Sequence, residues 1–177
     1  MVILKTQVQW MANGIMKEWD EQVATAYVYG GTLPYTGNGN WQKQIFDLIA
    51  NAVDGCVMFH CASGKDRTGV LSALLLGLVG VCENDIISDY IPSYDLIYNS
   101  PEYKKERDEC ISEEIQKTGR PRDEIIDELV KYNTTPPEKI KGVIDYIITN
   151  YGTFEKYLIA CGISQENLNK IKERFLK

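Results

Sequence analysis

The sequence CVMFHCASGKDRTGVLSALLLGL occupies residues 56–78 and decides the fold that we predict. Its first five residues, 56–60, form a short apolar run after Gly55, which is typical of a buried β-strand. A short loop follows. From Arg67 through Leu78 the pattern becomes helical and apolar almost all round, which predicts a central, enclosed helix. A buried strand joined by a tight loop to a buried helix indicates an α/β fold.

The loop between the predicted strand and helix has the spacing C-x5-R, from Cys61 to Arg67. A strand, a tight loop and a helix N-terminus point successive backbone N–H groups at an anion. Gly64 lies midway, where the chain needs a positive φ or a close approach to a ligand. Arg67 can bind two phosphate oxygens in bidentate fashion. We therefore predict a phosphate-binding loop, or P-loop.

The side chains of this loop also predict a reaction. The loop amides and the helix dipole would stabilise a Cys61 thiolate, which could attack phosphorus in line and form a phosphocysteine. Thr68 could donate a hydrogen bond to that thiolate, and His60 is expected to orient the loop. The leaving group needs a proton from a general acid. Asp66, inside the loop, is the first candidate for this acid, and Asp20 is the second.

Outside this segment the sequence is predominantly helical. Apolar spacing and capping residues predict helices over 6–30, 41–52, 101–117, 123–132, 137–151, 153–161 and 165–176, a loop over 33–40, and a short helix capped by Asn84. Residues Val2–Leu4 could supply one neighbour for the predicted strand 56–60. A sheet of two short strands is marginal, because many of its backbone groups stay unpaired. Either a strand has been misread as helix, with 25–29 as the candidate, or another chain completes the sheet.

Composition limits the classes of protein that fit. The 177 residues are 44% hydrophobic, which suits one compact domain, and the net charge of −6 argues against nucleic-acid binding. The longest apolar run, 70–82, is shorter than the roughly 20 residues that span a bilayer. The N-terminus lacks the pattern of a signal peptide. We expect a cytoplasmic protein without a transmembrane segment.

The cysteine and histidine content argues against both a disulfide framework and a metal site. The five cysteines form no CxxC pair, and the sequence has one histidine, so neither a disulfide framework nor a zinc site is expected. We predict no cofactor. Cys56, Cys82, Cys110 and Cys161 are expected to be buried structural thiols.

The ten residues 60–69, HCASGKDRTG, resemble the HCxxGKDRTG signature of the atypical tyrosine phosphatases of bacteria and fungi, which also act on phosphoinositides. Further likeness in 78–90 and 151–164 extends the resemblance over residues 41–177. The resemblance implies a cysteine-dependent phosphatase-like fold with a small central sheet and a predominantly helical complement. The implied substrates are phosphotyrosine, another phosphoprotein or a phosphoinositide.

The resemblance also assigns roles to single residues. Lys65 would contact extra substrate charge, as in inositol phosphates, although a solvated charge is an equal alternative. The implied site has catalytic Cys61, Asp66 and Arg67, phosphate contacts from Ala62, Ser63, Gly64, Lys65 and Arg67, and support from His60 and Thr68.

The departure from the family lies upstream of the signature. Family members usually carry a longer upstream region with several strands and an Asn-Phe-Arg-Asp-like motif, whereas this chain has 60 residues before Cys61 and lacks that motif. We expect one domain over 1–177, with upstream helices in 1–55, the strand, P-loop and helix core in 56–100, and a helical part in 101–177. We expect the upstream strands of the family to be missing from this layout.

A truncated gene, an internal start, or strand completion in a homo-oligomer would each explain the missing strands. Two other functions therefore remain open. One is a phosphate-binding module without catalysis, and the other is an inactive fragment that assembles through exposed sheet edges.

Overall fold

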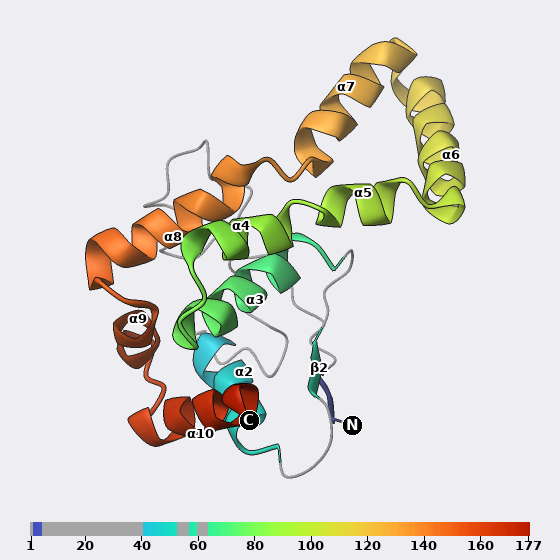
Figure 1. Cartoon of the computed structure of the whole chain (residues 1–177). Coiled ribbons are helices and arrows are strands. Elements are labelled where there is room, and N and C mark those ends of the chain that lie inside the picture. The colour runs from blue at the N-terminus through green and yellow to red at the C-terminus, as the bar shows by residue number, and fades with distance from the viewer. Residues whose placement is uncertain (1, 5–40, 53–56, 60–63) are drawn as a thin grey trace.

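The computed structural model describes residues 2–4, 41–52, 57–59 and 64–177 (Figure 1). The predicted helix over 6–30, the loop over 33–40 and the alternative strand over 25–29 lie outside these residues. The expectation that these segments form helix or strand therefore stays a prediction.

Two short strands are described. Strand β1 (Val2–Leu4) pairs in parallel with β2 (Val57–Phe59), with Val2 opposite Val57 and Leu4 opposite Phe59. The neighbour suggested for the apolar run is thus the one found beside it. Within the described residues this pair has no third strand, so the small central sheet stays a prediction.

The described part of the chain is otherwise mostly helical, as expected. In chain order the helices are α2 (Trp41–Ala50), α3 (Asp66–Leu78), α4 (Glu83–Tyr90), α5 (Ser93–Tyr98), α6 (Pro101–Thr118), α7 (Arg122–Asn133), α8 (Pro137–Tyr151), α9 (Phe154–Ala160) and α10 (Gln165–Leu176).

The ends of the helices follow local capping chemistry. The hydroxyl of Ser100 accepts a hydrogen bond from a backbone N–H in the first turn of α6, and Thr153 and Ser164 do the same for α9 and α10. Gly119 ends α6 with φ 69°, in the left-handed region that glycine adopts readily. Because these signals are local, the predicted bounds of these helices lie within one or two residues of the observed ones.

Helices α4 and α5 differ from the prediction. Asn84 was expected to cap a short helix, but α4 already begins at Glu83, so Cys82 is its N-cap residue. The Cys82 thiol donates to Oδ2 of Asp85 at 3.2 Å. Helix α5 was not predicted at all, since its six residues are too few to show a helical period.

Helix α3 lies at the centre of the core, as its apolar pattern predicts. Helices α4, α8 and α9 pack against it, while α10 packs on α2 (Figure 1). Six of its side chains are buried, namely Val70, Leu71, Ala73, Leu74, Leu75 and Leu78. None of the described helices combines the length and the apolar composition that crossing a membrane requires.

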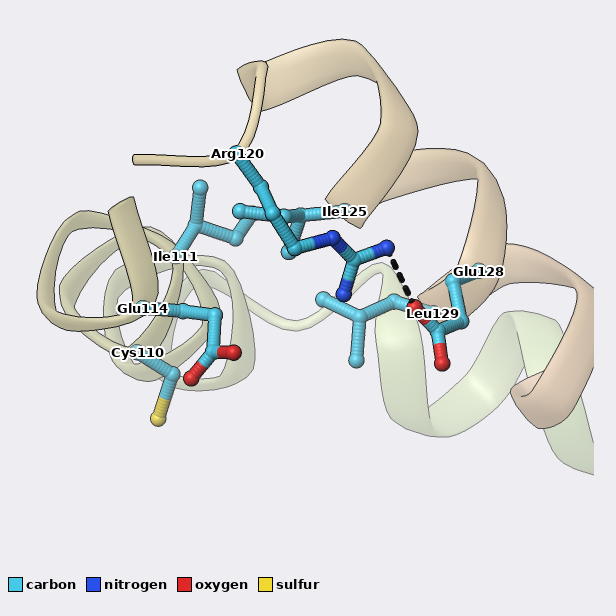
Figure 2. Close-up of a pocket in the computed structure, with 7 residues that line it drawn as sticks. All are labelled: Cys110, Ile111, Glu114, Arg120, Ile125, Glu128 and Leu129. Carbon is cyan, nitrogen blue, oxygen red and sulfur yellow. Dashed lines mark hydrogen bonds and ion pairs between the residues drawn. The ribbon is translucent and has the colours of Figure 1, made fainter. Parts of the chain in front are cut away.

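Helices α6 and α7 pack on each other and project from the rest of the molecule (Figure 1). A hollow of about 330 Å³ lies between them, where Arg120 donates to Glu128 at 2.7 Å (Figure 2). Cys110 lines this hollow and is exposed, and Cys82 is exposed as well. The expectation that these two cysteines are buried is therefore wrong, because neither faces the core around α3.

The close approach of α9 to α3 depends on Gly77. A Cβ at this position would lie 2.4 Å from Cδ2 of Phe154, whose ring is held in the core. We expect Gly77→Ala to lower the free energy of unfolding by about 1–2 kcal/mol, because overpacking outweighs the gain in helix propensity. Urea unfolding measures the change. Adding Phe154→Leu should restore part of the loss, whereas a Gly77→Ala protein more stable than the wild type would contradict the packing argument.

Candidate active site

The predicted site lies partly within the described residues. His60, Cys61, Ala62, Ser63 and Asp20 lie outside them, as does the side chain of Arg67. Gly64, Lys65, Asp66 and Thr68 are described, and Arg67 is the second residue of α3. The C-terminal half of the predicted loop can therefore be examined directly.

Gly64 adopts the conformation that the sequence suggested. Its φ is +61°, and an added Cβ would meet nothing within 4 Å. The glycine is therefore needed for its backbone angle rather than for space, since residues other than glycine disfavour a positive φ. The chain then enters α3 at Asp66, one residue earlier than predicted, and the Gly69 amide donates to the Lys65 carbonyl at 2.7 Å.

The Lys65 side chain points inward. It is 2% exposed, its Nζ atom lies 3.4 Å from Oδ2 of Asp66, and the same atom sits 5.5 Å from the centre of the Tyr98 ring. That ring stacks on Tyr94 at 4.6 Å and meets Tyr103 edge-on at 4.2 Å. The alternative that Lys65 is a solvated charge is therefore wrong, and a cation–π contact and an ion pair hold it instead.

Both oxygens of the Asp66 carboxylate have a partner. Oδ2 faces Lys65, and Oδ1 accepts a hydrogen bond from the Tyr90 hydroxyl at 3.1 Å. The side chain of Asp66 is 15% exposed. This first candidate for the general acid is thus largely removed from water.

Tyr90 ends α4 and is buried against the start of α3. The ring of Tyr90 packs in the hydrophobic core. The structure adds a polar contact to that packing, because its hydroxyl reaches Asp66. Burial raises the pKa of Tyr90, and the charge of Asp66 raises it further. The hydroxyl therefore keeps its proton and acts as the donor.

Lys139 was not singled out in the sequence, yet it belongs to the same cluster of charges. It lies in the first turn of α8, is 6% exposed, and donates from Nζ to the Thr134 carbonyl at 2.6 Å. Burial lowers its pKa, Lys65 lowers it further, and Asp66 partly opposes both. The sequence did contain a signal for the burial of Lys139. Val143 follows it by four residues, which places both on the same, buried face of α8.

Replacing Lys139 by methionine tests this buried charge. Because the pKa of Lys139 falls below its usual 10.5 on folding, the unfolded chain binds more protons between the two values. Wild-type stability therefore rises with pH through that window. We measure the free energy of unfolding in urea from pH 7 to 10. The difference between the wild type and Lys139→Met should change with pH in favour of the wild type, by at most about 1.4 kcal/mol per pH unit.

Lys141→Met is the control for this pH dependence. Lys141 is exposed, and its pKa is raised by hydrogen bonds to Asp145 and Glu83. Its contribution to stability is therefore lost only above 10.5, outside the measured range. If the free energy of unfolding had the same pH dependence in the wild type and in Lys139→Met, the lowered pKa of Lys139 would be contradicted.

Thr68 carries a notable polar atom. Its Oγ1 is buried and has no hydrogen-bond partner among the described residues. Buried hydroxyls are nearly always paired. Thr68 was predicted to donate to Cys61, which lies outside the described residues, so this role stays a prediction.

Three helices therefore contribute to the charged cluster around Asp66, and Asp66 itself belongs to α3. Tyr90 comes from α4 and Lys139 from α8, and Thr135 ties the segment before α8 to the end of α4 by donating to the Ile91 carbonyl at 2.6 Å. The arrangement can hold a carboxyl group in one orientation beside the end of the predicted phosphate loop.

Comparison with known proteins identifies the family of the chain. A model of a family described as the tyrosine phosphatase family matches residues 6–177. The match begins well upstream of residue 41, where the resemblance read from the sequence began.

Two curated relatives are similar over most of the chain. A tyrosine-protein phosphatase from Nostoc commune is 30% identical over 161 residues, which cover 90% of this chain and 51% of that protein. The triple specificity protein phosphatase PtpB of Mycobacterium tuberculosis is 32% identical over 174 residues, which cover 91% of this chain and 60% of that protein. The chain thus spans between half and two thirds of the length of these relatives.

Proposed function

This chain belongs to the tyrosine phosphatase family, and from that premise we propose that it hydrolyses phosphate monoesters through a phosphocysteine intermediate. The observation that carries the proposal is the setting of Asp66. A carboxyl group fixed by Tyr90 and Lys65 stands at the first residue of α3, within the ten residues of the family signature. This is a suitable place for proton exchange with a group bound in that loop.

The proposed reaction has two steps. In the first, the Cys61 thiolate attacks phosphorus, an S–P bond forms, the P–O bond to the leaving group breaks, and the departing oxygen takes a proton from Asp66. In the second, Asp66 accepts a proton from water as the water oxygen attacks phosphorus, and the S–P bond breaks to release phosphate and the thiolate. Arg67 and the loop amides would hold the phosphate oxygens in both steps.

The remaining signature residues support these steps. We propose that the amides of Ala62, Ser63 and Gly64 contact the phosphate, that His60 orients the loop, and that Thr68 donates to the thiolate. The buried Thr68 hydroxyl, which lacks a partner among the described residues, supports this last role.

We propose protein phosphotyrosine or another phosphoprotein as substrate, with phosphoinositides as a further class. One relative is named a triple specificity phosphatase, which supports a broad range. Lys65 would contact additional substrate charge. To do so, its ammonium group would exchange Asp66 for a substrate phosphate, because the two are paired in this structure.

The scaffold is also part of the proposal. We take residues 1–177 as one phosphatase-like domain in which β1 and β2 belong to a small central sheet. Further strands would come from outside the described residues or from a second copy of the chain. A cytoplasmic location and the absence of a nucleic-acid partner remain predictions of the sequence.

The test of the function is a turnover assay combined with a binding assay. We expect the wild type to hydrolyse p-nitrophenyl phosphate and to be stabilised against heat by vanadate, which mimics the pentacoordinate phosphorus of the transition state. Vanadate stabilisation without turnover would favour the phosphate-binding module. Neither effect would favour the assembly fragment, which a strong dependence of folding on protein concentration would support.

A further inference from the structure

The contact between Tyr90 and Asp66 joins two helices at the site. The hydroxyl of Tyr90, at the end of α4, donates to Oδ1 of Asp66, in the first turn of α3, at 3.1 Å across a sequence separation of 24 residues. The bond is part-buried, so water competes with it less than at the surface. A hydrogen bond to an ionised group in such a place is stronger and more directional than an exposed one.

A space in α3 admits the ring that makes this contact. A Cβ at position 69 would lie 2.6 Å from Cδ2 and 2.9 Å from Cε2 of Tyr90. Real Cβ atoms do not approach a ring so closely, so only glycine fits here without movement. Gly69 therefore sets how near the Tyr90 ring lies to α3, and the distance from the hydroxyl to Asp66 depends on that approach.

The ring and the hydroxyl of Tyr90 have separable tasks. The ring belongs to the hydrophobic core, a task that phenylalanine could perform equally well. The hydroxyl adds a single described partner, Asp66. Core packing therefore accounts for an aromatic residue at this position, but it does not account for the hydroxyl.

The groups around Asp66 leave one clear task for Tyr90. Lys65 faces the other carboxylate oxygen of Asp66, and the charge of Lys139 acts on the Lys65–Asp66 pair. Lys65 alone would let the carboxyl group turn about their shared contact, because an ion pair at 3.4 Å is weakly directional. A donor on the second oxygen removes that freedom.

We propose that Tyr90 is a positioning residue that fixes the orientation of the Asp66 carboxyl group for proton exchange with the leaving group and with water. The proposal rests on the phosphatase function and adds a residue to its mechanism. Gly69 takes part indirectly, because it admits the Tyr90 ring. Proton transfer is sensitive to such orientation, since a small misplacement of a catalytic group lowers the rate steeply.

The test compares leaving groups in Tyr90→Phe. We expect kcat/KM, which reports the steps up to P–O cleavage, to fall about tenfold for phenyl phosphate, which has a poor leaving group, and less than about threefold for p-nitrophenyl phosphate. KM should change little for either ester. The reason is that a poor leaving group needs the proton during P–O cleavage, whereas p-nitrophenolate leaves without it.

Tyr157→Phe is the matched control. Tyr157 is also a buried tyrosine, and its hydroxyl accepts a hydrogen bond from Gln42 at 3.1 Å. Like Tyr90→Phe, this substitution removes one tyrosine hydroxyl from the core, but Tyr157 does not contact Asp66. We expect this variant to treat both esters as the wild type does, with urea unfolding of the two variants showing comparable stability.

Gly69→Ala approaches the same contact from the other side. The new methyl group should displace the Tyr90 ring and produce the same selective loss on phenyl phosphate. The double variant Gly69→Ala/Tyr90→Phe should lose no more selectivity than either single one, since both remove one contact.

Several results would overturn the proposal. Tyr90→Phe with wild-type kcat/KM for both esters would do so, and so would an equal fall in kcat/KM for both, which would indicate a purely structural role. A lack of leaving-group selectivity in Asp66→Asn would also remove its basis. A wild type inactive on both esters is a different failure, because it contradicts the phosphatase function itself.

Discussion

Cys61→Ser is expected to lower kcat by about 10⁴-fold or more while the chain remains folded. A serine hydroxyl is not ionised at neutral pH, so the loop amides and the dipole of α3 have no thiolate to stabilise. The substitution changes one atom and leaves the predicted phosphate contacts in place. Hydrolysis of p-nitrophenyl phosphate measures the loss, and thermal unfolding with and without phosphate measures whether the loop still binds.

Cys82→Ser is the matched control for Cys61→Ser. Cys82 is exposed at the start of α4 and lies outside the signature, so the same chemical change there should leave turnover within about twofold of the wild type. Substantial activity in Cys61→Ser would show that another group attacks phosphorus. Loss of activity in both variants would point to general damage rather than to a nucleophile.

Asp66→Asn is expected to have the second largest effect. We expect kcat/KM, which reports the steps up to P–O cleavage, to fall by about 10²–10³-fold for phenyl phosphate and by less than about tenfold for p-nitrophenyl phosphate. An amide has nearly the shape of the carboxyl group and can still accept from Tyr90 at 3.1 Å, but it cannot release a proton to the leaving oxygen. The pair of esters therefore separates lost acid catalysis from lost binding.

Asp20→Asn decides between the two candidate acids. Asp20 lies outside the described residues, and its role as the second candidate stays a prediction. Leaving-group selectivity in Asp20→Asn but not in Asp66→Asn would transfer the acid role to Asp20. Equal losses on both esters in Asp66→Asn would mean that Asp66 supports the loop instead of donating a proton.

Local signals explain what the sequence could predict. The start of α8 at Pro137, the end of α6 at Gly119 and the start of α10 after Ser164 each depend on a neighbouring residue. The apolar pattern placed α3 in the core for a similar reason. Such features are properties of a few consecutive residues, and one sequence contains them in full.

Contacts between distant segments explain what the sequence could not predict. Lys65 was as easily read as solvated as bound, because nothing in its neighbourhood indicates the ring of Tyr98 on α5. The contribution of Lys139 depends on the packing of α8 against α3. The charged cluster around Asp66 therefore appears only once the helices are placed in space.

The two glycines that admit aromatic rings have a mechanical consequence for α3. Gly69 accepts the ring of Tyr90 from α4, and Gly77 accepts the ring of Phe154 from α9. The two positions are separated by two helical turns, about 12 Å along the axis. An aromatic ring packed against a glycine near each end of α3 opposes both translation of the helix along its axis and rotation about that axis. Because Gly64 and Lys65 run directly into α3, these two contacts also fix the position of both residues along the axis of α3 relative to α4 and α9.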